Sequence, residues 1–221
     1  MKFQKSNLIK NFFITAMVSI LLISSTATVF AASKTTNEKL SKEQFAKKYA
    51  LTLEEVTNMQ DNLDKAIVKL PKVKNGENVK VQVSDNLYLE SSLTETVTPQ
   101  KNSFLASTLT TSLTSYENTE NTITATLKLK NTLGVTVVTL TSVGVFLCNG
   151  TISLPDNAYG SYTSVGTNIV TYSAIGPSNY NAWAKNVFSG NYTYSDFTLL
   201  SFSKTNIIYC NAIGEYSSSW Y

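Results

Sequence analysis

The sequence predicts a mainly β protein: an antiparallel β-sandwich, immunoglobulin-like or similar, preceded by a short N-terminal helical hairpin. From Asn75-Gly76 onward, apolar residues recur at every second position, which is typical of half-buried strands. Gly, Asn and Ser interrupt that pattern at roughly the spacing of sandwich turns. Before Pro71, apolar residues recur instead at spacings of three and four, which predicts amphipathic helices.

Residues 1–32 have the organisation of a secretory signal peptide. Three lysines precede an apolar core over residues 12–23, and small residues follow at 29–32. The apolar core is about twelve residues, whereas roughly twenty are needed to cross a bilayer. We therefore expect cleavage near Ala31 or Ala32 and release from the cell. The alternative is an uncleaved segment in which the small residues extend the apolar run.

Charge and composition exclude several classes of function. The formal net charge of +3 equals the contribution of the signal's lysines, Lys2, Lys5 and Lys10, so the mature chain is near neutral and nucleic acid is not an expected partner. The chain has no His, and therefore lacks the usual general base and the usual zinc ligand. It also has no Arg for bidentate binding of phosphate. We expect a protein without enzymatic activity, cofactor or metal.

A polar, flexible leader is expected over residues 33–39, and a helical segment over 40–71. Ser41 with Gln44 and Thr52 with Glu55 have the spacing of capping boxes, which predicts a short helix and then a longer one. Pro71 ends the second helix. Its apolar stripe consists of Leu53, Val56, Met59, Leu63, Ile67 and Leu70.

The two predicted helices, a short one and a longer one joined by a tight link, have the arrangement of a DNA-binding helix-turn-helix. They follow an export signal and contain no Arg, so we interpret them as an amphipathic hairpin. Its apolar stripe would dock on a partner or on the domain that follows. The helical segment is alternatively a propeptide.

The chain over residues 72–221 is predicted to form the sandwich domain. The clearest strand is 122–130, where apolar residues alternate with Thr and Lys. Leu133-Gly134 then turns the chain into a strand over 135–148, which is apolar on both faces in places and is therefore expected to be central. Further strands are predicted over residues 79–83, 87–90, 168–173, 182–188, 192–202 and 205–212.

Two segments of this domain carry specific expectations. Asn149-Gly150 predicts a tight two-residue hairpin into a strand over 151–154, because both turn positions require positive φ. Residues 101–121 are rich in Ser and Thr and are predicted to be an extended linker that leads into an edge strand.

Cys148 and Cys210 are the two cysteines of the chain. An even number of cysteines in an exported protein favours a disulfide. This bond would close a loop of about sixty residues and would stabilise the fold by about 4 kcal/mol on the chain-entropy model. The alternative is a pair of buried thiols, because free cysteine is among the most buried residue types. No cysteine precedes Cys148, so no lipid anchor is expected.

Aromatic residues crowd the last third of the chain. Exposed on one face, they would form a platform for sugar rings or for a protein partner, since Tyr and Trp give a large contact area at a small entropic cost. The alternative is packing in the core and across strands. The candidates are Tyr159, Tyr162, Tyr180, Trp183, Tyr192, Tyr194 and Trp220, with Tyr172 and Tyr221 in the same part of the chain.

Two other functions remain open. Asp156 and Asp196 are the candidate carboxylates of a glycosidase, which needs two carboxyl groups across one sugar bond, although Pro155-Asp156-Asn157 is also an ordinary turn sequence. Residues 109–129 contain two Ser/Thr-rich arms of the kind that some secreted toxins insert into membranes.

Three segments resemble a pattern of uncharacterised secreted proteins of Gram-positive bacteria. They are Asn-Thr-Leu-Gly at 131–134, Val-Gly-Val-Phe-Leu-Cys-Asn-Gly at 143–150 and Ala-Ile-Gly-Glu-Tyr-Ser at 212–217. In those proteins an aromatic residue usually takes the position of Cys148. The resemblance covers about residues 121–217, and it implies a fold but no activity.

The sequence therefore predicts a secreted, non-enzymatic β-sandwich protein that acts as a binding or interaction module at or near the cell surface. Its expected partner is a protein or a glycan. The main alternative is a membrane-active toxin or bacteriocin-like protein that uses residues 109–129, and the third possibility is a carbohydrate-active enzyme.

Overall fold

The computed structural model describes residues 38, 41–99, 119–163, 167–195 and 197–221. The chain divides into two units, Met1–Gln44 and Phe45–Tyr221. In the first unit, Lys42 and Glu38 form an ion pair of 3.1 Å. The predicted signal peptide, most of the leader and residues 101–118 of the predicted linker lie outside the described residues. Residues 119–121 of that linker belong instead to β4 (Thr119–Asn131). Within the part of the chain that the structure describes, every helix is too short or too polar to cross a bilayer.

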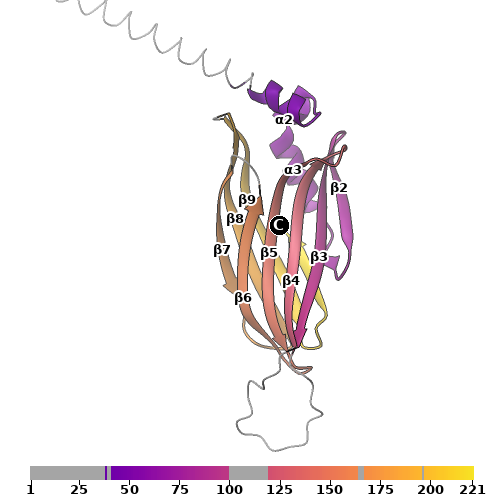
Figure 1. The fold of residues 1–221 in the computed structure, drawn as a ribbon, viewed down its shortest axis with the longest axis vertical. Helices are drawn as coiled ribbons and strands as arrows, with labels where there is room; N and C mark the ends of the chain where they lie inside the picture. Colours follow the sequence, from indigo (N-terminus) through magenta and orange to yellow (C-terminus); the bar gives the residue numbers. More distant parts are fainter. Residues whose placement is uncertain (1–37, 39–40, 100–118, 164–166, 196) are drawn as a thin grey trace, which may run out of the picture. The chain divides into compact units, whose positions relative to one another are not determined.

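The second unit is an antiparallel β-sandwich preceded by helices, which confirms the predicted fold class (Figure 1). Residues 41–48 are helical, as predicted for the short helix, and they are followed by α2 (Leu53–Thr57) and α3 (Met59–Val68). The strands are β1 (Val73–Lys74), β2 (Asn78–Ser84), β3 (Leu87–Pro99), β4 (Thr119–Asn131), β5 (Thr136–Cys148), β6 (Ser153–Thr163), β7 (Thr167–Ile175), β8 (Asn181–Tyr194), β9 (Phe197–Asn211) and β10 (Tyr216–Trp220). Sheet A has the order β1-β10-β9-β8-β7, and sheet B has the order β2-β3-β4-β5-β6.

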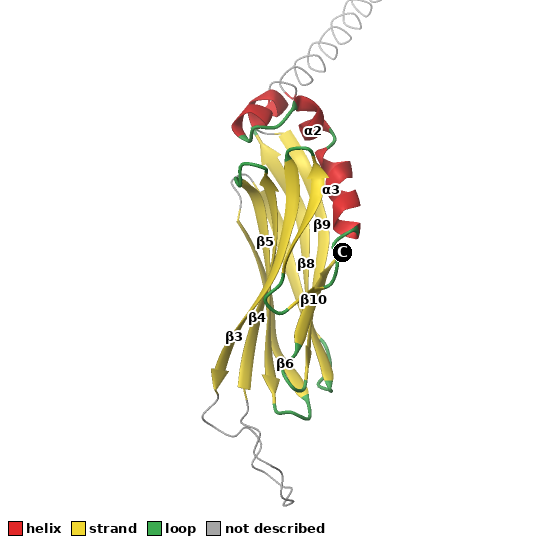
Figure 2. Cartoon of the chain, turned by 90° about the vertical axis from the view of Figure 1, so that its right-hand side faces the viewer, coloured by secondary structure: helices red, strands yellow, loops and turns green. Residues whose placement is uncertain are grey.

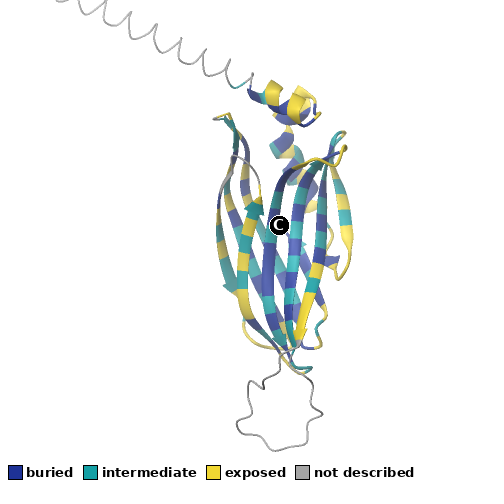
Figure 3. Ribbon diagram, viewed as in Figure 1, coloured by how far each residue is buried: buried dark blue, intermediate teal, exposed yellow. Residues whose placement is uncertain are grey.

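The core lies between the two sheets and follows the period of two in the sequence. In β4, the predicted inward residues Ile123, Ala125, Leu127 and Leu129 are all buried, whereas the residues between them are half-buried. Figure 3 shows this alternation as bands of burial along the strands. The two sheets approach closely at Gly144, because a Cβ added there would lie 2.8 Å from the Cβ of Ala184 in β8.

A buried polar contact also joins the sheets. Asn186 of β8 donates from Nδ2 to Ser142 Oγ at 2.7 Å and to the carbonyl of Val143 at 3.2 Å, both in β5. Asn186 and Ser142 are fully buried. Asn186 and Ser142 are hydrogen-bonded to each other across the two sheets, so both buried polar side chains are satisfied. These hydrogen bonds fix the alignment of the sheets.

The capping box at Thr52 and Glu55 is confirmed. The single long helix predicted after it is instead two helices, α2 and α3, which meet at Asn58. Asn58 has φ −95° and ψ 7°, outside the helical region, and its side chain makes no capping bond. The chain leaves α3 at Lys69, before Pro71, as predicted.

Helix α3 lies beside β9 at the edge of the sandwich (Figure 2). Met59, Leu63 and Ile67 of its apolar stripe are buried in the same hydrophobic cluster as the sandwich core. Polar contacts support this packing: Gln60 Oε1 accepts a hydrogen bond of 2.8 Å from the Ser201 amide, and Asp64 pairs with Lys204. The predicted docking of the apolar stripe on the following domain is therefore observed for most of its residues, whereas Leu53 is exposed.

Two predicted strand boundaries in sheet A are wrong. The prediction placed one strand over 192–202 and another over 205–212, but β8 ends at Tyr194 and β9 runs without interruption from Phe197. Ser203 and Lys204, which the prediction left between two strands, continue β9, since they pair with Ser189 and Phe188 of β8 and Lys204 meets Asp64 of α3.

The β5–β6 hairpin is confirmed, but its two-residue turn is wrong. Cys148 pairs with Ser153, which leaves a loop of four residues between the strands. Only Gly150 of the Asn-Gly pair has positive φ, at 81°. The Asn149 side chain instead accepts hydrogen bonds from the amides of Thr151 at 3.0 Å and Ile152 at 2.8 Å.

Two expectations about strand positions have different outcomes. β4 is not the edge strand expected after the linker, because it pairs with β3 on one side and with β5 on the other. β5 is an interior strand as predicted, paired with β4 and β6. The turn between β4 and β5 is also confirmed. Gly134 has φ +82°, and the side-chain oxygen Oδ1 of Asn131 accepts a hydrogen bond of 2.7 Å from the Val135 amide.

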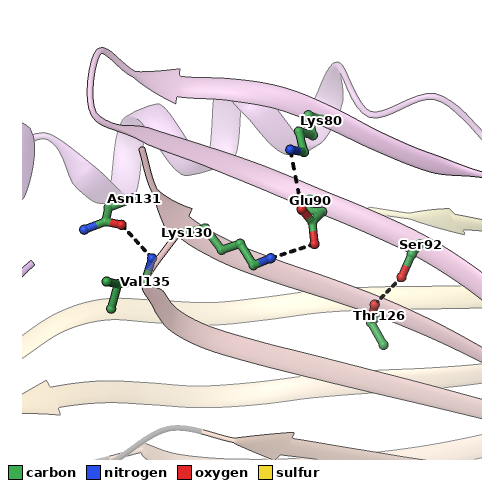
Figure 4. A network of polar contacts seen from close by, with 7 residues as sticks. All are labelled: Lys80, Glu90, Ser92, Thr126, Lys130, Asn131 and Val135. Carbon is green, nitrogen blue, oxygen red and sulfur yellow. Dashed lines mark hydrogen bonds and ion pairs between the residues drawn. The ribbon is translucent and has the colours of Figure 1, made fainter. Parts of the chain in front are cut away.

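The outer face of sheet B carries a ladder of charged and hydroxyl side chains (Figure 4). Glu90 lies between Lys130 at 2.8 Å and Lys80 at 3.8 Å, and the hydroxyls of Ser92 and Thr126 are 2.7 Å apart. These ion pairs and this hydrogen bond link the side chains of β2, β3 and β4 to one another. An open groove lies on the other sheet.

Candidate functional site

A groove with a volume of about 930 Å³ lies on the outer face of sheet A. Its floor is formed by β9 and β10, and its walls by the β9–β10 turn, by the chain around β1 and by the start of β8. Tyr209 belongs to this floor because it alternates with Ile208 and Cys210, which are both buried in the core. The period of two therefore directs its ring away from the core and into the groove.

Tyr209 is an aromatic residue of the groove lining. It stands directly opposite Trp183 of β8 and Ser217 of β10 in the strand register. The ammonium of Lys72 lies 5.1 Å from the centre of its ring, a cation–π distance. Lys72 is held there because the next residue, Val73, pairs with Ser218 and is almost fully buried.

Trp183 extends the aromatic surface beside the groove. Its ring covers Gly176, where an added Cβ would clash with the Trp183 indole nitrogen. The Gly176 amide also donates to the Trp183 carbonyl at 2.9 Å. Glycine is therefore required at this position for the tryptophan to lie flat against the strand ends.

Asn211 organises the turn between β9 and β10. Its Oδ1 accepts hydrogen bonds from the amides of Ile213 at 3.2 Å and Glu215 at 2.9 Å. Its Nδ2 donates to the Glu215 carboxylate at 2.9 Å. Gly214 completes the turn with φ +85°. The turn thus holds one carboxylate at the wall of the groove in a fixed position.

The loop that follows β1 forms another wall of the groove, and it too holds a carboxylate by a backbone hydrogen bond next to a glycine of positive φ. The amide of Lys74 donates to the Glu77 carboxylate at 2.8 Å, and Gly76 in between has φ +71°. The Gly76 amide bonds to the Leu93 carbonyl at 3.2 Å and thereby ties this loop to β3. Asn181 adds a side-chain amide from the start of β8.

The groove combines an aromatic ring with a balanced set of polar groups. Two lysines, two glutamates and three asparagines contribute donors and acceptors to its lining. Equal numbers of cations and carboxylates favour a ligand without large net charge. Such a surface can stack a ring against Tyr209 while the side-chain amides and carboxylates bind hydroxyl groups. Among the described residues, no cluster of three or more His, Cys, Asp or Glu is arranged to hold a metal ion.

Tyr216 of the groove lining has a carboxylate, that of Glu95, near its hydroxyl group. Burial raises the pKa of Tyr216, and the nearby carboxylate of Glu95 raises it further. Burial likewise raises the pKa of Glu95 above its usual value. Glu95 pairs with the buried Ile123, so it points inward from β3 toward sheet A.

The two cysteines meet in the core directly behind the groove. Their sulfurs are 3.5 Å apart and unbonded, and both residues are buried. Cys148 ends β5 in sheet B, and Cys210 lies in β9 of sheet A, between the groove residues Tyr209 and Asn211. The structure therefore brings the predicted pair together and presents it as two thiols.

The predicted aromatic surface is dispersed. Trp183 lies on the outer face of sheet A next to Tyr209 and is half-buried. Tyr180 is 52% exposed in the loop before β8. Tyr159 is 49% exposed but belongs to β6 of sheet B, and Tyr162 of the same strand is partly buried against the core.

Two of the predicted surface residues are buried, which is a correction to that set. Tyr192 is 1% exposed and Trp220 is 4% exposed, because both occupy inward positions of their strands. Trp220 packs against Phe188, with ring centres 5.7 Å apart. Tyr192 and Tyr194 surround Phe45, with ring centres at 5.9 and 5.4 Å.

Asp156, one of the two predicted carboxylates, is not among the described residues that line the groove. Asp156 is exposed in β6, at an irregularity where Val145 pairs with Asn157 and the next residue of β5 pairs with Pro155. The predicted turn at this position is therefore a bulge within a strand. Asp196 lies outside the described residues.

Sequence reasoning missed the central residue of the groove, Tyr209, and its partners Lys72 and Glu215. A signal was present: in the strand predicted over 205–212, Tyr209 has the parity opposite to Ile208 and Cys210. Lys72 and Glu215 carried no such signal, since the pairing of β1 with β10 brings Lys72 to the groove and the turn between β9 and β10 brings Glu215.

No protein-family model, curated protein or solved structure matches this chain.

Proposed function

We propose that this protein is an exported, non-enzymatic binding module that holds a glycan in the groove of sheet A, at or near the cell surface. The observation that carries the proposal is the arrangement around Tyr209. The Tyr209 ring lines an open groove together with the carboxylates of Glu77 and Glu215 and the side-chain amides of Asn181 and Asn211.

The chemistry of the groove favours a sugar over other ligands. Sugar rings present C–H faces that pack on an aromatic ring, and adjacent hydroxyls that suit planar amides and carboxylates. A charged ligand would be repelled by one half of the lining, since two lysines and two glutamates balance.

The size of the groove favours a glycan over a folded protein partner. Its volume of about 930 Å³ is within the range of about 300–1,000 Å³ for pockets that enclose small ligands. A folded protein partner would instead need a contact surface of about 800 Å² on each side of the interface. A groove of this volume suits a few linked sugar units.

Export is supported by the sequence of residues 1–32, which has a charged start, an apolar core and small residues at its end. The resemblance to secreted Gram-positive proteins makes cell-wall polysaccharide the first probe to use. If the proposal holds, protein recovered from the culture medium begins directly after Ala31 or Ala32.

Binding of the purified chain to Gram-positive cell walls, and to soluble fragments of their polysaccharide, tests the ligand. Tyr209→Ala should weaken binding about tenfold or more, because a central aromatic contact contributes roughly 1.5–3 kcal/mol. Tyr159→Ala is the matched control, since it removes an exposed tyrosine from the outer face of sheet B. The control variant should bind as the unaltered chain does.

Three outcomes would overturn the proposal. One is equal binding by the Tyr209→Ala variant and the unaltered chain. The second is release of shortened polysaccharide, abolished by Glu77→Gln or Glu215→Gln, which would make the protein an enzyme. The third is leakage of lipid vesicles without any binding to polysaccharide, which would favour the membrane-active alternative.

A further inference from the structure

Cys148 and Cys210 are brought together by the sandwich although they lie 62 positions apart in the chain. Cys148 belongs to sheet B and Cys210 to sheet A, so a bond between them would join the two layers of the fold. Their sulfurs are 3.5 Å apart. A disulfide requires about 2.05 Å, and an approach of this order needs small side-chain rotations and no change of strand pairing.

The surroundings of the two sulfurs favour this bond. Cys148 is 4% exposed and Cys210 is fully buried, so neither thiol is available to a bulky external partner once the sheets have packed. Cys148 Sγ lies 3.6 Å from Ser153 Oγ and 3.5 Å from the Asn211 carbonyl. Each cysteine therefore has the other as its only cysteine within reach, since the chain contains two.

We propose that Cys148 and Cys210 are a modification site: in oxidising surroundings they become a disulfide that ties β5 of sheet B to β9 of sheet A behind the groove. The bond would fix the strand that carries Tyr209 and Asn211. The inference concerns covalent structure alone, so it does not depend on the identity of the groove's ligand.

The reaction is a thiol–disulfide exchange with an external disulfide, either a small molecule such as oxidised glutathione or an extracellular oxidoreductase. One of the two cysteine thiolates attacks one sulfur of the oxidant and forms a mixed disulfide, and one thiol leaves. The other cysteine thiolate then attacks the sulfur of the first cysteine and expels the second thiol. The two cysteines lose two protons and two electrons in total, and the oxidant gains them as two thiols.

Both thiols are buried in the finished fold, so the first step takes place while the sheets are still open and either cysteine can attack first. In the packed fold, a hydrogen bond with Cys210 lowers the pKa of Cys148, while the same bond and burial raise the pKa of Cys210. Packing of the two sheets then brings the second sulfur within 3.5 Å of the first.

Refolding of the full chain in an excess of oxidised glutathione tests the inference. The product is then denatured, treated with iodoacetamide and weighed as an intact protein. We expect a mass about 2 Da below that of the reduced chain and no alkylation. Its unfolding midpoint should be about 10 °C above that of the reduced chain, as expected when a long loop is closed.

The Cys148→Ser variant is the control. It should show the same unfolding midpoint in oxidised and reduced buffer, because it cannot form the bond. If this variant does not fold, the mass measurement on the unaltered chain still decides the question. Alkylation of both cysteines, or a stable glutathione adduct on one of them, would overturn the inference.

Discussion

Glu55 is a single residue on which several parts of the fold converge. Its carboxylate accepts hydrogen bonds from the Thr52 amide at 2.8 Å, the Ser84 hydroxyl at 2.8 Å and the Asn86 amide at 2.8 Å. The Asn86 side chain donates a further bond at 3.1 Å. The residue thus caps α2 and also fastens it to the turn between β2 and β3.

These bonds make the stability of the protein depend on pH. Burial raises the pKa of Glu55, but the hydrogen bonds from Thr52, Asn86 and Ser84 outweigh it and lower the pKa to about 2, from 4.5. A carboxyl with a lowered pKa stabilises the fold above pH 4.5 and loses this effect as the pH falls toward 2. We expect about 2 kcal/mol to be lost by pH 3.

Urea denaturation at pH 7 and at pH 3 measures this effect. Glu55→Gln should lower the free energy of unfolding by about 2 kcal/mol at pH 7, since the NH2 group of glutamine would face the amide and hydroxyl donors that the carboxylate accepts from. The variant should also lose less stability than the unaltered chain on acidification. Glu54→Gln is the matched control, because Glu54 is exposed in the same helix. Equal acid sensitivity of the Glu55→Gln variant and the unaltered chain would show that another group is responsible.

At the scale of elements, the close approach of β5 and β8 depends on one glycine. A Cβ at Gly144 would lie 2.8 Å from Ala184 Cβ in the opposite sheet and 2.8 Å from the ring of Phe146. Both distances are shorter than real carbon contacts. The two sheets would have to move apart to accept even a methyl group, because protein interiors are closely packed.

Gly144→Ala is therefore expected to lower the free energy of unfolding by about 1–3 kcal/mol. Ala184→Gly removes the opposing methyl group, so the double variant should recover part of this loss. Urea denaturation of the two single variants and the double variant gives the coupling free energy. Strictly additive changes would mean that the two positions do not constrain each other.

At the scale of the whole unit, the helical segment and the sandwich share one core. Leu63 and Ile67 of α3 line a small cavity of about 10 Å³ together with Leu89, Leu127 and Phe202 of the sandwich. Burial of a large apolar side chain contributes about 1.5–3 kcal/mol, and a complete domain has only about 5–15 kcal/mol of stability. Loss of the helices would therefore remove a large share of that stability.

A chain that starts at Pro71 should bind the dye ANS and lose cooperative thermal unfolding, in contrast to a chain that starts at Ser33. The reason is that Leu89, Leu127 and Phe202 lose their cover. Val68→Ser in the longer chain is a control with no expected effect, since Val68 is 86% exposed. Cooperative unfolding of the shorter chain at an unchanged temperature would instead favour a removable propeptide.

Local signals in the sequence predicted most elements of this fold. The capping box at Thr52 depends on residues three positions apart, and the strand over 122–130 on its own alternation, so both could be inferred without distant partners. Lys204 shows where this reasoning failed. A polar residue inside β9 resembles a turn until its partner, Asp64 of α3, is known.

The sequence by itself determined the fold class, the hairpin between β5 and β6 and the exclusion of histidine-based chemistry, since these follow from composition and short-range spacing. The tertiary structure decided the rest. The pairing of β1 with β10 and of β10 with β9 gathers Lys72, Tyr209 and Glu215 into one groove, and the stacking of the two sheets places Cys148 beside Cys210. Such contacts join residues far apart in the chain, and only the packed core fixes which of them meet.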